Sequence, residues 1–346
     1  MKHLFTILLT LFSFYASGYA QKPFKVVFYN LENFFDLEND PDVLDDEFTP
    51  EGPKKWTKDK YDKKLSNIEK VFFDIAAINK DYPAVIGVCE IENRNVLEDI
   101  VATQKLSPAN YRIVHYDSPE LRGVDAAFMY RPDVLKLEGS KAIRTVIPSL
   151  PDFKTRDIVT MWGKIDQEDF FFMVAHWPSR LGGKEASALR RIAVGNQMRH
   201  IADSVRALRP STKVVMMGDF NDDPTDESIS GEKGIGAKIK VKEVTPADYY
   251  APFAALLKAG YGTLAYGDAW NIFDNIVVSG NLINEDKDQL KLKKTDNSKF
   301  YGHIFKRHYM VQKEGQFKGY PLRTYVGNNF QGGFSDHLPV YIYIGK

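Results

Sequence analysis

Cysteine is nearly absent from this chain, which has 346 residues and a single Cys, Cys89. No disulfide can form within the chain, and the CxxC pairs of zinc sites are missing. The sequence also lacks HExxH, GxSxG and a glycine-rich phosphate-binding loop. These absences exclude the common zinc-protease, serine-hydrolase and P-loop chemistries. Cys89 lies inside the apolar run AVIGVCE and is expected to be a small core residue.

An excess of charge of one sign is also lacking. Lys and Arg together number 46, as do Asp and Glu, so the formal net charge is zero. The protein therefore has no global basic field to attract nucleic acid. A local basic groove is still compatible with a neutral chain. The composition, 44% hydrophobic and 27% charged, is that of an ordinary globular protein.

Long apolar runs are confined to the first twenty residues. MKHLFTILLTLFSFYASGYA has Lys2 before the apolar run and small residues near its end, which is typical of a secretory signal peptide. The run is short for a spanning helix, which needs about 20 apolar residues. We therefore predict a signal peptide at 1–20 and a single domain at 21–346. Export to a periplasm or the cell exterior follows, with no stable membrane association and an undefined oligomeric state.

The order of apolar runs predicts an α/β protein. Strands are expected at residues 24–30, 83–90, 111–116, 124–132, 155–165, 169–177, 213–220, 272–280 and 337–344, and helices at 58–80, 93–104 and 184–208. The last helix is expected to bury a face made of Leu189, Ile192, Met198, Ile201, Val205 and Leu208. Residues 31–56 read as a long surface loop, and residues 281–334 as long loops or a small insertion. Hairpins mixed with helices favour two mixed sheets packed face to face, with helices outside.

Polar side chains end most of the predicted strands. They are Asn30 with Glu32, Glu90, His176, Asp219 with Asn221, Asp274, and the Asp336–His337 pair. One such residue is more often a turn residue than a ligand. Strand ends of a layered α/β fold nevertheless converge on one edge, where sites form. Carboxylate and amide oxygens suit Mg²⁺ or Mn²⁺, and a His with a carboxylate partner can stabilise an imidazolium. Together these groups suit attack of water on a phosphate ester.

Eight short segments carry a family resemblance: YNLEN, VCEIEN, RGVDAAFMYRP, TRD, AHWPSR, GDFNDDP, FDNI and SDHLPV. In this order they resemble the endonuclease/exonuclease/phosphatase superfamily, in particular its pancreatic-type deoxyribonucleases and secreted bacterial-type members. The resemblance spans about residues 24–344. It implies a four-layer α/β sandwich with two central mixed β-sheets flanked by helices.

The resemblance also implies a metal site for Mg²⁺ or Mn²⁺. Glu90 would be the principal ligand, helped by Asn30 and Glu32, and Asp336 would touch the metal site. Glu32 stands where some members carry Asp, and it is still a ligand for a hard cation.

The catalytic roles follow in the same way. Asp219 and Asn221 would position the attacking water and the phosphate. His337 would pair with Asp274 and either accept a proton or stabilise the pentacovalent phosphate. His176 would contact the phosphate, although Ala175 before it replaces an Asn of many members. The predicted phosphate contacts are completed by Arg122 and Arg156.

The expected activity is hydrolysis of phosphodiester bonds by a secreted nuclease. A phosphatase or phospholipase C-type enzyme acting on inositol phosphates or sphingomyelin shares the machinery and is the alternative. Basic residues at 296–334, Arg323 among them, would help to bind a polyanion or would form a solvated loop. An inactive binding module of the same fold is the third hypothesis. Such a module should have lost Glu90, Asp219, Asn221 or His337, and the sequence keeps all of them.

Overall fold

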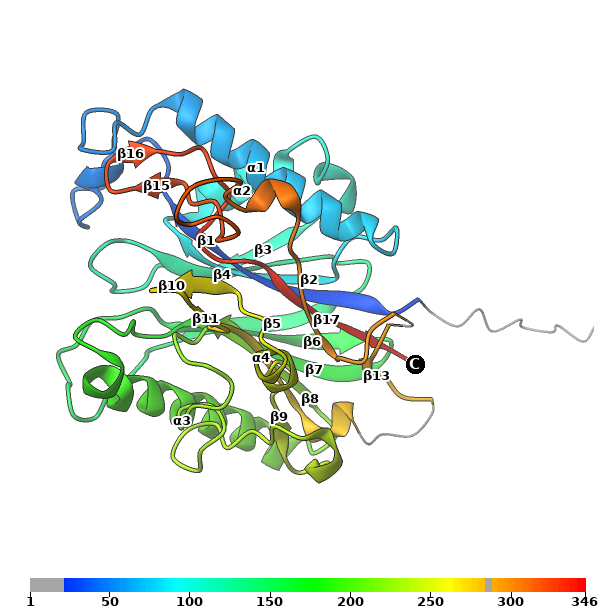
Figure 1. Ribbon diagram of the computed structural model, residues 1–346. Helices are drawn as coiled ribbons and strands as arrows, with labels where there is room; N and C mark the ends of the chain where they lie inside the picture. Colours follow the sequence, from blue (N-terminus) through cyan, green and yellow to red (C-terminus); the bar gives the residue numbers. More distant parts are fainter. Residues whose placement is uncertain (1–21, 284–287, 296) are drawn as a thin grey trace, which may run out of the picture.

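The computed structural model describes residues 22–283, 288–295 and 297–346. The predicted signal peptide at 1–20 lies outside these residues. Figure 1 shows two central sheets, with helices α1 and α2 on one outer side and α3 on the other. The predicted α/β sandwich of four layers is therefore confirmed.

The first sheet has seven strands in the order β13–β17–β1–β2–β4–β3, and β14 also pairs with β17. Their bounds are β1 Phe24–Phe34, β2 Val85–Ile91, β3 Arg112–His115, β4 Asp125–Tyr130, β13 Lys291–Lys293, β14 Gly302–Ile304 and β17 Val340–Gly345. Strands β1 and β2 are parallel, whereas the other pairs are antiparallel. The sheet is mixed, as expected.

The second sheet has six strands in the order β5–β6–β7–β8–β12–β9. Their bounds are β5 Lys136–Ile143, β6 Ile158–Ile165, β7 Glu168–His176, β8 Lys213–Asp219, β9 Tyr249–Tyr250 and β12 Asp274–Ser279. Only β7 and β8 run parallel among these pairs. Two small hairpins pair β10 (Leu264–Tyr266) with β11 (Ala269–Asn271), and β15 (Tyr325–Val326) with β16 (Asn329–Phe330).

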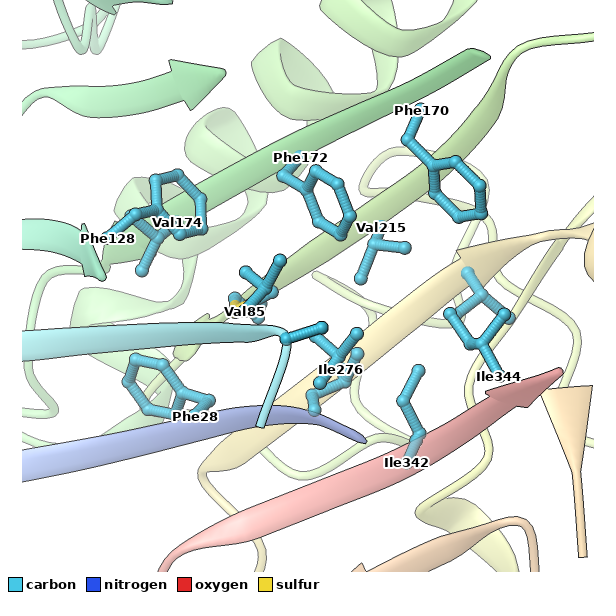
Figure 2. Close-up of a cluster of buried hydrophobic side chains, with 14 of the residues drawn as sticks. Phe28, Val85, Phe128, Phe170, Phe172, Val174, Val215, Ile276, Ile342 and Ile344 are labelled. Atoms are coloured by element: carbon cyan, nitrogen blue, oxygen red, sulfur yellow. The ribbon is translucent and has the colours of Figure 1, made fainter. Parts of the chain in front are cut away.

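The main core lies between the two sheets. Figure 2 shows Phe28 and Phe128 from the first sheet facing Phe172, Val215 and Ile276 from the second. All five side chains are fully buried. Successive strand residues point to opposite faces, so every second residue of β1, β4, β7, β8 and β12 enters this core. The same alternation decides which residues at the strand ends face the space between the sheets.

The helices cover the outer faces of the two sheets. They are α1 (Lys58–Ala77), α2 (Arg94–Ala102) and α3 (Lys184–Leu208), whereas the short α4 (Ala254–Lys258) contributes Leu256 to the core between the sheets. Asn93 caps α2, because its side chain accepts a hydrogen bond from the Val96 amide. Among the described residues, no helix is both long and apolar enough to cross a bilayer.

The predicted buried face of α3 is wrong in part. Leu189 and Leu208 are 69% and 85% exposed, while Arg191 and Gly195 are buried. Gly195 lies so close to the Ser228 carbonyl that an added Cβ would come within 2.3 Å of it. Arg191 forms an ion pair of 2.8 Å with Asp222. The helix therefore packs through a small residue and a buried charge, which hydrophobic periodicity cannot reveal.

The two stretches predicted as loops contain regular structure. β1 continues to Phe34, and a three-residue 3-10 helix follows at Asp46–Phe48. The side chains of Phe34, Phe35 and Phe48 are buried. Residues 291–304 contribute β13 and β14, which cover the edge of β17. An exposed sheet edge offers unpaired backbone groups, and β13 and β14 pair with those of β17. Strand β5 (KLEGSKAI) was not predicted, because this partly exposed strand has no apolar run.

Candidate active site

Three predicted site residues form a row across the end of the second sheet. His176 of β7 is the register partner of Asp219 of β8, and Asp219 is the register partner of Asp274 of β12. Each lies two positions along its strand from a residue of the inter-sheet core, namely Val174, Met217 or Ile276, and so shares that residue's face of the sheet. Their side chains are buried and, by this alternation, point toward the first sheet. Strand register alone therefore brings three of the predicted site residues together.

The first sheet brings Glu90 to this row by a β-bulge. Alternation places Cys89 in the inter-sheet core and would turn Glu90 to the outer face. The ladder between β2 and β4 shifts register between Cys89 and Ile91, so Glu90 is an extra residue. Glu90 Oε1 accepts a hydrogen bond of 3.1 Å from Asn30 Nδ2, so the carboxylate reaches the inner side. Bulges that redirect a side chain are common beside active sites.

Three predicted site residues at these strand ends have a left-handed backbone conformation. Glu32, Glu90 and Asn221 have φ values of 51°, 59° and 51°. This left-handed region costs a non-glycine residue free energy and persists only where surrounding contacts enforce it. Positive φ also occurs at described residues far from this edge, such as Lys80 and Asn110, so the conformation adds weight to these three residues only together with their place in the site.

Glu90, His176 and Asp219 together form a possible metal site. Each offers one ligand atom, and these atoms lie within 4.8 Å of one another. Asn30 Nδ2 joins the carboxylates, at 3.1 Å from Glu90 Oε1 and 3.0 Å from Asp219 Oδ2. His176 Nε2 lies 3.6 Å from Asp219 Oδ2. Carboxylate oxygens such as those of Glu90 and Asp219 suit Mg²⁺ or Mn²⁺, whereas an imidazole such as that of His176 is more typical of transition-metal sites.

Burial controls the protonation of this cluster. Burial raises the pKa of Asp219 to about 7, against the effect of nearby His337. Burial, reinforced by the positive charges of Arg156 and Arg122, lowers the pKa of His176 well below its ordinary value. His176 is therefore neutral at physiological pH, and its unprotonated ring nitrogen can accept a hydrogen bond or bind a metal ion. Its Nδ1 is buried without a hydrogen-bond partner among the described residues.

His337 and Asp274 form the predicted pair. His337 Nδ1 lies 2.7 Å from Asp274 Oδ2, and its Nε2 lies 3.7 Å from Asp219 Oδ2. Burial opposes the charged imidazole, but the carboxylates of Asp274 and Asp219 outweigh it and raise the pKa of His337 well above its ordinary value. A protonated His337 facing the cluster can stabilise negative charge that develops on a phosphate.

The GDFNDDP turn divides its polar residues between the site and the scaffold. The Asn221 amide donates to Asp219 Oδ1 at 2.9 Å, and the Asn221 side chain donates to the Trp177 carbonyl. Asp222 instead pairs with Arg191 and Arg180, at 2.8 and 3.2 Å. Asp223 accepts hydrogen bonds from Ile272 N and Asn271 Nδ2. The second and third acids of the turn therefore hold the loop in place.

Glu32 and Asp336 both contact the guanidinium of Arg323. Arg323 Nη2 donates to Asp336 Oδ2 at 2.6 Å, and Arg323 Nε lies 3.5 Å from Glu32 Oε1. Asp336 Oδ1 is 4.0 Å from His337 Nε2. Burial raises the pKa of Glu32 to about 7, reinforced by the charge of Asp336. The predicted ligands thus form two neighbouring groups, Glu90 with Asn30 and Glu32 with Asp336.

The predicted phosphate-binding arginines differ in environment. Arg156 is buried, and its Nε has no hydrogen-bond partner among the described residues. Burial lowers the pKa of Arg156, with further lowering by Arg122 and an opposing contribution from Glu90. Arg122 is largely exposed and pairs with Glu120 at 3.2 Å. A buried guanidinium with an unused donor suits an incoming anion, whereas Arg122 already has a carboxylate partner.

Sequence reasoning missed three residues that hold the site together. Ser335 Oγ donates to the Asn30 carbonyl at 2.7 Å and accepts from the His337 amide at 3.0 Å. Lys64 Nζ donates to the Glu32 carbonyl at 2.8 Å, although a Lys on a helix gives no signal of burial. Arg323 was predicted only as part of a basic loop. Ser335 was detectable, because it stands within the SDH motif.

Two mixed sheets with acidic, amide and histidine side chains at their strand ends define a phosphoesterase fold. A family model described as Endonuclease/Exonuclease/phosphatase family matches residues 25–346. This chain belongs to that family, whose enzymes typically depend on a divalent metal ion. No curated protein matches the sequence.

Solved structures share the fold at low sequence identity. D. rerio TDP2 complexed with single strand DNA product has a TM-score of 0.53 and 13% identity, covering 94% of this chain and 100% of that one. Bacteroides thetaiotaomicron mannosyl-6-phosphatase has a TM-score of 0.54 and 15% identity, with coverages of 93% and 100%. The human Nocturnin catalytic domain with bound sulfate anion has a TM-score of 0.52 and 15% identity, with coverages of 93% and 94%.

Proposed function

We propose that this chain is an exported, Mg²⁺- or Mn²⁺-dependent phosphodiesterase that acts on nucleic acid. The row of His176, Asp219 and Asp274 facing Glu90, with His337 held by Asp274 at 2.7 Å, carries the proposal. Residues 1–20 support export by their signal-like pattern. The proposed DNA or RNA substrate draws support from the structural likeness to TDP2 bound to a DNA product.

The metal would be held by Glu90 with Asn30, Glu32 and Asp336, and by the oxygens of the phosphate. Bound there, it would neutralise phosphate charge and polarise the ester. Asp219, with a pKa of about 7, is suited to accept a proton from the attacking water, which Asn221 helps to place. His337 is suited to stabilise the charge on the phosphate as the bond to the leaving oxygen breaks.

Hydrolysis of a phosphate monoester is the second candidate. Buried Arg156, with its unused Nε donor, favours this candidate because a monoester carries an extra negative charge. The likeness to a mannosyl-6-phosphatase adds a precedent on the same fold. Residues 296–334 would influence binding of either substrate through their basic side chains.

A substrate panel separates the two candidates. Residues 21–346 are assayed with Mg²⁺ on plasmid DNA, RNA, bis-p-nitrophenyl phosphate, sugar and inositol phosphates, and sphingomyelin. Cleavage of nucleic acid that is lost in Glu90→Ala supports the nuclease. If only monoesters or lipid are hydrolysed, and this activity is also lost in Glu90→Ala, the protein is a phosphatase or phospholipase instead of a nuclease.

A further inference from the structure

The segment Arg323–Thr324 touches both carboxylates of the second ligand group. Arg323 Nη2 donates to Asp336 Oδ2 at 2.6 Å, and its Nε lies 3.5 Å from Glu32 Oε1. The Thr324 amide donates to the other oxygen of Glu32, Oε2, at 2.6 Å. Two consecutive residues therefore bind side chains that lie 304 positions apart in the sequence, at 32 and 336.

The scaffold fixes this segment from behind. Buried Lys64 of α1 donates to Thr324 Oγ1 at 2.5 Å and to the Glu32 carbonyl at 2.8 Å. The Gly333 amide donates to the Arg323 carbonyl at 3.1 Å, and Asn67 of α1 donates to the Gly333 carbonyl at 2.7 Å. A Cβ on Gly333 would come within 2.1 Å of the Arg323 carbonyl oxygen, so only glycine permits this approach.

The contacts leave each carboxylate with one oxygen for another partner. Glu32 Oε2 accepts the short hydrogen bond from the Thr324 amide, while Oε1 lies 3.5 Å from Arg323 Nε. Asp336 Oδ2 is taken by Arg323, while Oδ1 has His337 Nε2 at 4.0 Å. Carboxylates that bind metals are commonly oriented in this way by hydrogen bonds to their other oxygen.

We propose that Arg323 is a positioning residue that orients Glu32 and Asp336 to bind the divalent cation. This inference rests on the proposed function, because it takes these carboxylates as metal ligands. Arg323 holds two neighbouring carboxylates whose charges would otherwise drive them apart. It acts through them and contacts neither the metal nor the reacting phosphate.

The test is direct Mn²⁺ binding by calorimetry, with no substrate present. The variants are Arg323→Met and Arg323→Lys. Arg209→Met is the matched control, because Arg209 is exposed and its contact with Glu138, at 3.9 Å, is long for an ion pair. Arg323→Met is expected to weaken Mn²⁺ binding by about 10–100-fold, the scale for losing a partner that orients a ligand. Arg323→Lys should restore part of the affinity. Saturating Mn²⁺ should restore most of kcat, with KM for bis-p-nitrophenyl phosphate unchanged.

Other outcomes overturn the inference. Unchanged Mn²⁺ affinity with a raised KM would mean that Arg323 binds the substrate. Tighter Mn²⁺ binding in Arg323→Met would mean that the guanidinium competes with the metal. If Arg323→Met fails to fold, as judged by circular dichroism, unaltered affinity in Arg323→Lys relative to the Arg209→Met control counts against the role.

Failure of the proposed function gives a different pattern. Suppose that wild type hydrolyses no phosphate ester but Arg323→Met still weakens Mn²⁺ binding. The positioning role of Arg323 would then stand, and the proposed activity would be wrong. If wild type hydrolyses a phosphate ester and the Arg323 variants bind Mn²⁺ as tightly as wild type, the proposed activity would stand and the positioning role would be wrong. Wild-type protein that binds no Mn²⁺ contradicts both.

Discussion

Replacing Asp274 by Asn tests the charge of the His337 pair without removing its hydrogen bond. Asp274 is fully buried, and its Oδ2 lies 2.7 Å from His337 Nδ1. The Asn oxygen can take the place of Oδ2 and keep the imidazole in position. What the variant loses is the negative charge that raises the pKa of His337 and stabilises its charged form.

The expected loss follows from the size of this interaction. Opposite charges about 4 Å apart interact by about 4 kcal/mol at an effective dielectric constant near 20. If the transition state relies on the imidazolium, turnover should fall by about 10³-fold, since about 1.4 kcal/mol corresponds to tenfold. Stability should change less. The new amide nitrogen replaces Oδ1, which has no hydrogen-bond partner among the described residues, and removal of a buried charge offsets part of its burial cost.

The assay is kcat for bis-p-nitrophenyl phosphate at saturating Mg²⁺, beside thermal unfolding of each protein. Asp62→Asn is the control, because Asp62 is exposed and forms a surface i,i+4 ion pair with Lys58. A folded Asp274→Asn protein with turnover within tenfold of wild type would refute the role given to the pair.

Three further predictions concern the metal, pH and packing. Glu90→Gln should lower turnover at least ~100-fold, as EDTA should in wild type; kinetics check both, and activity retained in EDTA would exclude metal dependence. Burial lowers the pKa of His303 to about 4 in the folded protein. Between about pH 6.5 and pH 4 the unfolded chain therefore binds more protons than the folded protein, and the free energy of unfolding decreases as the pH is lowered. His303→Phe should remove at most about 3 kcal/mol of this dependence in urea melts, and an unchanged slope would contradict it. Gly218→Ala should cost about 2 kcal/mol or more of stability in the same melts, because its Cβ would lie 1.9 Å from the Ala175 carbonyl oxygen; a neutral effect would show that β7 and β8 can separate.

The strand-end positions of His176, Asp219 and Asp274 could be predicted from the sequence, because each of them lies at one end of an apolar run. Each apolar run fixes which residue ends its strand, and layered sheets bring those ends together. The pairing of His337 with Asp274 was implied by the family resemblance, and the structure places His337 Nδ1 2.7 Å from Asp274 Oδ2.

Other features depend on contacts that no local pattern encodes. The bulge that turns Glu90 inward is a register shift between β2 and β4, so it needs both strands. Arg191 reads as a solvated helix residue until Asp222, 31 positions later, gives it a buried partner. Arg323 was assigned to a basic loop, since the sequence does not show that Glu32 and Asp336 lie beside it.

The most direct test of the account is hydrolysis of bis-p-nitrophenyl phosphate by EDTA-treated residues 21–346, before and after Mg²⁺ is added. Wild type should be inactive without metal and regain turnover with Mg²⁺, while folded Asp219→Asn and His337→Ala proteins should stay at least ~100-fold slower. Turnover that is indifferent to Mg²⁺, or equal in these variants, would contradict a metal-dependent phosphoesterase site at these strand ends.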